Sequence, residues 1–302
     1  MLTSMGARSL QTAYMAGARV CSMNDFRRMG PSGLELWLAT HGAGASPVLD
    51  EICAQKDAHT ARLYWFTELP AAIVEAQRTQ RPILSLRLLG RLDEELSCAN
   101  SRFFRKLLYP DPRINQVLRN DFVLHWQSVR PVPKITIDFG DGRWIERTLT
   151  GNSAHVVLDM HGRAADALPG LMSREMFLAQ LIQARSLALA RRDQLAALHA
   201  LAGSWLRVVG SVSRAVTASR IAPSKHRIEA PLLRAVELDL AADTAQNLEL
   251  YRRIHEAFAA RAEWAGLDGF VEWIYAELFE MPPGDAALGL DVPDPFPLAA
   301  AG

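Results

Sequence analysis

The sequence predicts an α/β fold in which helices flank one mixed β-sheet, followed by an all-helical C-terminal module. Between residues 61 and 180, short apolar segments alternate with segments of helical spacing, which is the pattern of a layered α/β domain. Residues 134–150 alternate in polarity on both sides of Gly-Asp-Gly, which predicts a β-hairpin. Residues 181–280 carry long apolar helical stripes and no convincing strand.

The composition of the chain is that of an ordinary globular protein. It has 302 residues, of which 49% are hydrophobic and 22% charged, enough for one large domain or two ordinary ones. Lys and Arg together number 33, as do Asp and Glu, so the net charge favours neither nucleic acid nor an anionic membrane as a partner. The first 20 residues lack the apolar core of a secretory signal, and no window has the roughly 18 apolar residues of a membrane span. We therefore expect a cytoplasmic protein, and its oligomeric state stays open.

The first part of the α/β segment reads as helix, strand, helices and strand. Residues 68–80 have helical spacing, with Pro70 suited to the first turn. Residues 82–90 form a short apolar run that predicts a strand. The next segments predict helices at 101–109 and 114–121 and a second strand at 122–126, while 61–66 is either an edge strand or a packing segment.

After the hairpin, residues 154–170 predict two strands joined by a turn at His161-Gly162, and Ser173 suits the cap of a following helix. The pattern divides the chain into four parts. These are an irregular or helical lead-in at 1–60, the α/β domain at 61–180, a helical module at 181–280 and a Pro-rich tail at 281–302. In the helical module, Trp205, Trp264 and Trp273 are expected to pack in a core.

The three cysteines, Cys21, Cys53 and Cys98, lie far apart in the sequence. No CxxC pair or zinc-type cluster is present, and an odd number argues against a disulfide framework. His155 and His161 flank a predicted strand near Asp159, without the spacing of metal ligands. We therefore expect free thiols in a reducing compartment and neither a metal nor another cofactor.

The order of elements, with Cys98 at the start of the first helix that packs on the sheet, resembles the thioredoxin-like superfamily. The sequence itself most resembles a bacterial branch of thioredoxin-domain proteins with CxxS in place of CxxC. The resemblance covers roughly residues 61–185. The stretches that carry it are ARLYWFTELPAAIVEAQ, RPILSLRLLGRLDEELSCANSRFFR, FVLHWQSVRPVPKITIDFGDGR and TLTGNSAHVVLDMHGRAADALPGL.

The resemblance implies thiol-disulfide exchange at a cysteine at a helix N-terminus, where the helix dipole favours the thiolate. Cys98 stands at the nucleophile position and Ser101 at the resolving position, so any cycle would be monothiol, with a protein thiol or a small thiol as the partner. The family's cis-proline position falls near Ala154. Ser153 and Ala154 are therefore candidate substrate-binding residues. Trp126, at the end of the second predicted strand, is a third, although packing is the more common role of an aromatic residue at a strand end.

Three departures weaken the catalytic interpretation. Ser97 stands where the family commonly has tryptophan, and no proline lies between Gly151 and Asp159. The acidic run 93–95 directly precedes Cys98 and opposes a thiolate.

The start of the cysteine's helix has two possible registers. A cap at Ser97 puts Cys98 in the first turn, whereas a cap at Asp93 puts it in the second turn with little benefit from the dipole. The Ser101 hydroxyl could bond the Cys98 sulfur or, as is more frequent, a backbone carbonyl.

The arginines around the site could receive an anion or a substrate carboxylate, although solvated, Glu-paired arginines are the default. They are Arg87, Arg91, Arg102 and Arg105. Two functional hypotheses follow. One is a monothiol protein acting in thiol-disulfide exchange or redox sensing at Cys98. The other is a non-catalytic scaffold of the same fold that binds a partner protein through its helical half.

Overall fold

The computed structural model describes residues 22–148, 152–209, 233–261 and 264–285. Its centre is a four-stranded mixed sheet of β1 (Ile83–Leu89), β2 (Val123–Arg130), β5 (Ser153–Leu158) and β6 (Ala164–Pro169), in the order β2-β1-β5-β6. β1 and β2 run parallel, while β5 is antiparallel to both β1 and β6. Every residue of β1, β5 and β6 is buried, as expected for strands covered on both faces.

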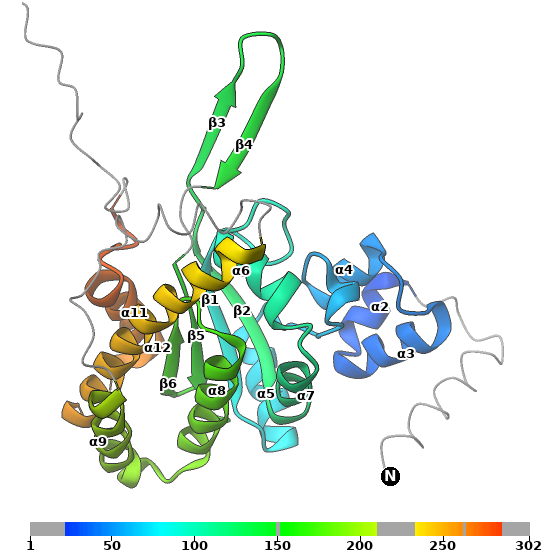
Figure 1. Cartoon of the computed structure of the whole chain (residues 1–302). Helices are drawn as coiled ribbons and strands as arrows, with labels where there is room; N and C mark the ends of the chain where they lie inside the picture. The colour runs from blue at the N-terminus through cyan, green and yellow to red at the C-terminus, as the bar shows by residue number, and fades with distance from the viewer. Residues whose placement is uncertain (1–21, 149–151, 210–232, 262–263, 286–302) are drawn as a thin grey trace, which may run out of the picture.

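Helices flank this sheet, as predicted (Figure 1). α5 (Leu69–Thr79) has Pro70 in its first turn and packs on β1 and β2. The connection from β1 to β2 contains α6 (Ala99–Phe103), which continues into a π-helical turn, η2 (Phe104–Leu108), and then α7 (Pro112–Asp121). After β6, Ser173 caps α8 (Arg174–Leu189) by accepting the Met176 N–H at 3.3 Å.

The lead-in is helical in its described part. It contains α2 (Met23–Arg28), α3 (Pro31–His41), α4 (Pro47–Cys53) and the short 3₁₀ turn η1 (Ala58–Thr60). These elements bury a hydrophobic cluster of their own around Phe26, Leu49 and Ile52. Residues 61–66, which follow, are a packing segment with one isolated bridge, between Phe66 and His125, and no strand.

The predicted hairpin is confirmed. β3 (Lys134–Asp138) pairs antiparallel with β4 (Trp144–Thr148) in a two-stranded sheet of its own. Gly140 and Gly142 in the connecting turn have φ of 76° and 86°, a region that favours glycine. Figure 1 shows the hairpin projecting from the body of the molecule.

From Leu181 onward the described residues contain helices and no strand. After α8 these are α9 (Arg192–Val209), α11 (Leu233–Ala260), α12 (Gly266–Trp273) and the π-helical turn η3 (Ile274–Leu278). The helices pack on the sheet through β6, and buried side chains of α11 such as Leu250 and Ile254 belong to the same hydrophobic cluster as the strands. The predicted boundary at residue 181 is therefore a change in secondary structure within one continuous core, and the division into domains stays a prediction.

Candidate functional site

Cys98 is the N-cap residue of α6. Its backbone N–H donates to the Leu89 carbonyl at the end of β1 (3.3 Å), and its own carbonyl accepts the first helical hydrogen bond from the Arg102 N–H (3.3 Å). The cysteine therefore stands directly before the helix that follows β1. Its side chain is fully buried, and a thiol without access to solvent cannot meet a disulfide substrate.

Both predicted helix starts are wrong. Asp93 does not cap the helix, because its carboxylate accepts two hydrogen bonds from the Arg91 guanidinium, at 2.9 and 2.7 Å, in a bidentate ion pair. Ser97 precedes the cap, and its hydroxyl hydrogen-bonds Ser101 instead (2.6 Å). The helix begins one residue later than the Ser97 register, with the extended backbone of Cys98 (φ −58°, ψ 154°) as the cap.

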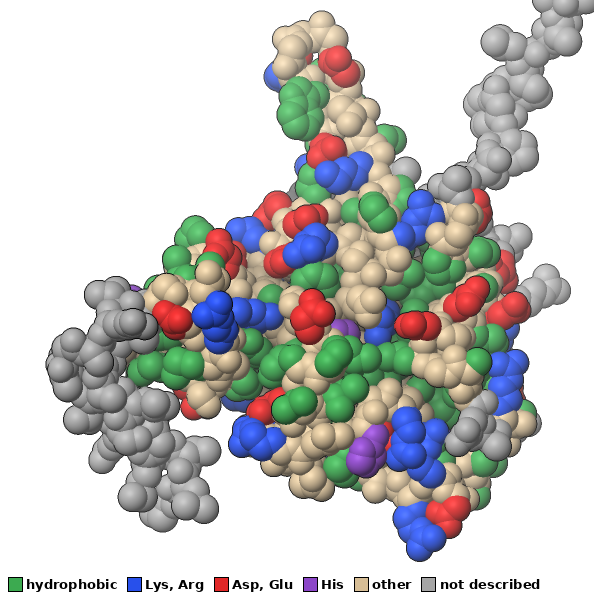
Figure 2. Space-filling view, turned by 180° about the vertical axis from the view of Figure 1, so that it is seen from behind, with side chains coloured by type: hydrophobic (Ala, Val, Ile, Leu, Met, Phe, Trp, Pro, Cys, Tyr) green, Lys and Arg blue, Asp and Glu red, His purple; other side chains and the backbone are tan. Residues whose placement is uncertain are grey.

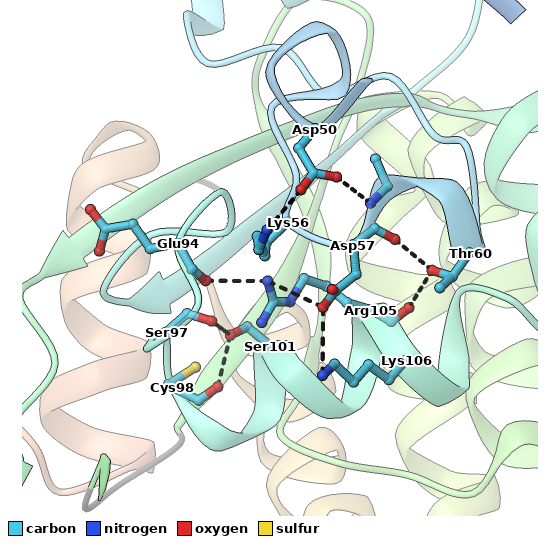
Figure 3. Close-up of polar contacts among 11 residues, drawn as sticks. Asp50, Lys56, Asp57, Thr60, Glu94, Ser97, Cys98, Ser101, Arg105 and Lys106 are labelled. Carbon is cyan, nitrogen blue, oxygen red and sulfur yellow. Dashed lines mark hydrogen bonds and ion pairs between the residues drawn. The ribbon is translucent and has the colours of Figure 1, made fainter. Parts of the chain in front are cut away.

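The Ser101 hydroxyl makes the more common of its two possible interactions. It donates to the Cys98 carbonyl at 2.7 Å and lies 2.6 Å from the Ser97 hydroxyl (Figure 3). Ser101 is itself fully buried. The hydroxyl therefore stabilises the first turn of α6, and a serine at this position cannot close a disulfide with Cys98.

The three candidate substrate-binding residues are buried. Ser153 accepts a hydrogen bond from the Asn100 side-chain amide (3.1 Å), which links the start of β5 to α6. Ala154 pairs with Arg87 of β1 inside the sheet. The Trp126 indole donates to the Ala54 carbonyl (2.8 Å), so it anchors the lead-in to β2. A substrate-binding role for them stays a prediction.

Arg105 belongs to η2, the turn that continues α6. Its side chain is fully buried, contrary to the expectation of solvated arginines. Its Nη1 donates to the Glu94 carbonyl (3.2 Å) and lies 3.9 Å from Asp57 Oδ2, which also faces Lys106 at 3.7 Å (Figure 3). Its Nε and Nη2 have no hydrogen-bond partner among the described residues. Burial lowers the pKa of Arg105, with Asp57 opposing that shift. The arginine therefore joins η2 to the lead-in.

The other three arginines divide between buried and exposed positions. Arg87 is buried and donates to the Gln127 side chain, and burial lowers the pKa of its guanidinium. Arg102 donates to Thr148 at the base of the hairpin (3.0 Å). Arg91 is exposed and fits the solvated, Glu-paired default, because it pairs with Asp93 at 2.7 Å and with Glu94 at 3.5 Å.

Two buried histidines lie in the sheet near this helix. His125 Nδ1 hydrogen-bonds Ser85 at 2.8 Å, and His155 Nε2 hydrogen-bonds the Tyr109 hydroxyl at 2.7 Å. Burial lowers the pKa of each imidazole to about 3, so both are neutral at physiological pH. His161 is exposed on a turn whose Asp159 carboxylate accepts backbone N–H groups and pairs with Arg163.

A buried polar cluster that sequence reasoning missed lies where α9 and α11 meet β6. One potential ligand atom from each of Asp166, His199 and His255 lies within 4.8 Å of the others, and all three residues are buried. Their sequence separation is large and irregular, so no spacing signal could have found them. Tyr251 donates to Asp166 Oδ2 at 2.6 Å. Burial raises the pKa of Asp166 to about 7.

The hydrogen bonds of this cluster fix its tautomers. His199 Nε2 lies 2.8 Å from the Ala165 carbonyl, which can only accept, so Nε2 carries a proton and Nδ1 accepts from His255 Nδ1 at 2.6 Å. The two coordinating nitrogen atoms of imidazole ligands on one tetrahedral zinc ion lie about 3.3 Å apart, because each Zn–N bond is about 2.0–2.1 Å long. The shorter separation is that of an N–H···N hydrogen bond. In this structure the cluster is held together by hydrogen bonds.

The described surface also contains an apolar groove between α8, α9 and α11, with a volume of about 450 Å³. Leu201 is 59% exposed and Trp205 69% exposed, so the expectation that Trp205 packs in a core is wrong. Gln180 is buried in the groove, and its Oε1 has no hydrogen-bond partner among the described residues. The lining residues are Met176, Gln180, Gln183, Ser186, Leu187, Leu198, Leu201, Ala202, Trp205, Leu206 and Leu248.

Of the other two cysteines, Cys53 is buried at the end of α4, and burial raises the pKa of its thiol to about 12. Cys21 lies outside the described residues. Among the helices that the structure describes, none is both long enough and apolar enough to cross a membrane. Comparison of the chain with family models, curated proteins and solved structures finds no significant match.

Proposed function

We propose that this chain is a thioredoxin-like, non-catalytic protein that binds a partner protein through its helical half. The order of elements from β1 to α8 supports the fold assignment, because it is the order on which the resemblance rests. Cys98 directly before α6 supports it further, since the family's cysteine precedes the helix after the first strand. The departures at Ser97 and at the cis-proline position are consistent with a fold that has lost its catalytic groove.

The observation that carries the binding function is the apolar groove between α8, α9 and α11. Large apolar side chains such as Leu201 and Trp205 cost free energy in water, and aromatic residues of this kind are common energetic centres of protein interfaces. An amphipathic helix with an apolar face fits this surface.

Site-specific photo-crosslinking tests this proposal. A photoreactive amino acid at Trp205 should capture one partner in cells, while the same amino acid at Val74, 67% exposed on α5, should not. The captured protein, once purified, should bind the wild type, and Leu201→Glu should weaken that binding at least about tenfold because it puts a charge in the groove. The matched control, Val74→Glu, should leave it unchanged.

Three results would contradict the groove as a partner site. The crosslinker at Trp205 could capture only residues of the same chain, such as those of the segment 210–232. It could capture the same proteins as the crosslinker at Val74. Finally, the purified partner could bind Leu201→Glu as tightly as the wild type.

A second candidate function, monothiol chemistry at Cys98, is favoured by the position of the cysteine as the cap of α6. It requires an opening motion that exposes the sulfur. The wild type should show negligible reduction of insulin disulfides with dithiol recycling, and Ser101→Cys should not create that activity while Cys98 stays buried. Turnover by Ser101→Cys at a rate typical of dithiol enzymes would show an accessible groove and favour the redox function.

A further inference from the structure

The β3–β4 hairpin offers an unpaired strand edge and exposed apolar side chains. Ile135, Ile137 and Phe139 are 40%, 45% and 52% exposed and alternate along one face of β3 and its extension into the turn. Figure 2 shows apolar, basic and acidic side chains gathered along this projection. The sheet contains only β3 and β4 within the described residues, so the outer edge of β3 has no strand partner there. Such an edge is a template for another strand.

The register of the hairpin fixes which backbone groups face outward. The Phe139 N–H donates to the Arg143 carbonyl at 3.0 Å, so this pair is a hydrogen-bonded one. Hydrogen-bonded and non-hydrogen-bonded pairs alternate in an antiparallel ladder. The backbone N–H and C=O groups of Ile135 and Ile137 therefore hydrogen-bond β4. Those of Lys134, Thr136 and Asp138 point away from β4.

The sequence of β3 is Lys-Ile-Thr-Ile-Asp. When a second copy of this strand is laid antiparallel to it, opposite charges face each other at the two ends and isoleucines face each other between them. An antiparallel pairing of two copies around a two-fold axis at Thr136 sets Lys134 opposite Asp138 of the partner subunit and Ile135 opposite Ile137 of the partner subunit. The residues aligned as hydrogen-bonded pairs are the three whose backbone groups face outward. Opposite charges directly across a strand pair are stabilising, as are paired β-branched side chains.

The outer edge of β4 lacks this complementarity. A two-fold axis at the centre of Trp144–Thr148 sets Glu146 against Glu146 of the partner subunit, a like-charge contact. We propose that two copies of this chain associate through their β3 edges, forming a four-stranded antiparallel sheet in the order β4-β3-β3-β4. The interface is isologous, as closed two-fold dimers require. This dimer interface is separate from the proposed partner site, because it uses the edge of β3 and not the groove between α8, α9 and α11.

Proline substitutions on the two outer edges test this dimer directly. Thr136→Pro removes an outward N–H that β4 does not use, and proline is tolerated on edge strands at such positions. The matched control is Glu146→Pro, which removes an outward N–H from the edge of β4. Sedimentation velocity over a wide concentration range should show a monomer–dimer equilibrium for the wild type and for Glu146→Pro. Thr136→Pro should weaken dimerisation by at least about tenfold.

A charge exchange gives a second test that does not depend on proline. Lys134→Asp or Asp138→Lys alone creates two like-charge pairs per dimer and should weaken association by roughly tenfold. The double variant with both substitutions restores opposite charges and should recover dimerisation. A wild type that stays monomeric at every concentration would overturn the proposal. Equal weakening by the two proline variants, or no recovery in the double variant, would also overturn it.

Discussion

Replacing His155 with glutamine should reduce the loss of folding stability between pH 7 and pH 5 by the share that His155 contributes. The imidazole is fully buried between aromatic rings, where Nε2 hydrogen-bonds the Tyr109 hydroxyl. Burial lowers its pKa from 6.5 to about 3. As the pH falls through 6.5, the unfolded chain binds a proton at this residue and the folded protein does not. Stability is therefore lost over this range.

The size of the effect follows from the pKa difference. One pH unit corresponds to about 1.4 kcal/mol for one proton, so His155 alone should cost the wild type about 2 kcal/mol between pH 7 and pH 5. Glutamine keeps an acceptor for the Tyr109 hydroxyl and cannot bind that proton. The substitution will change the free energy of unfolding at pH 7 by some amount of its own. Between pH 7 and pH 5, however, the free energy of unfolding of the variant should fall by about 2 kcal/mol less than that of the wild type.

Urea titrations at pH 7 and pH 5, followed by circular dichroism, measure this difference. The matched control is His161→Gln, the same substitution on an exposed turn. If both variants show the pH dependence of the wild type, His155 is protonated as easily in the folded protein as in the unfolded chain. That result would refute its burial in a dry core.

Two further predictions concern the contact between the helices and β6. Asp166 has a folded pKa of about 7, against 3.8 when exposed, so this carboxyl alone should contribute a loss of roughly 4 kcal/mol in folding stability as pH rises from 4 to 8, and Asp166→Asn should remove most of that contribution in urea titrations at both pH values. An unchanged pH dependence would contradict the buried Asp166–Tyr251 pair. Gly170 has φ of 63°, and an added Cβ would overlap the Asn247 amide of α11, whereas Gly140 (φ 76°) has open space around it. Gly170→Ala should therefore lower the free energy of unfolding by about 2 kcal/mol more than Gly140→Ala, and equal costs would contradict the close packing of the Asn247 side chain against Gly170.

The secondary structure of the sheet region could be predicted because local pattern and tertiary environment agree there. The apolar run of β1 is a strand buried on both faces, and the alternation around Gly140 and Gly142 is a hairpin. Ser173 caps α8 because a serine side chain satisfies the free N–H groups of a first helical turn. These signals involve residues close in the sequence.

The failures concern side-chain contacts that a local pattern does not show, some between neighbouring residues and some with distant ones. Ser97 and Asp93 were both reasonable caps, but each hydrogen-bonds another side chain, which leaves Cys98 as the cap. The burial of Arg105 depends on the Glu94 carbonyl and on the lead-in, which a helical pattern does not show. Likewise, the exposure of Trp205 depends on how α8, α9 and α11 are spaced. A stripe of apolar residues cannot distinguish a core from a groove.

Alkylation of Cys98 in the native wild-type protein tests most directly the claim that this chain does not use its thiol in catalysis. Labelling with N-ethylmaleimide at neutral pH, followed by tryptic digestion and mass spectrometry, reads Cys98 separately, with buried Cys53 as an internal reference. We predict that Cys98 is labelled only as fast as the protein unfolds, and that its rate rises with urea in step with the unfolded fraction. Rapid labelling of Cys98 in the absence of urea, while Cys53 stays protected, would contradict the account and make the monothiol function the better proposal.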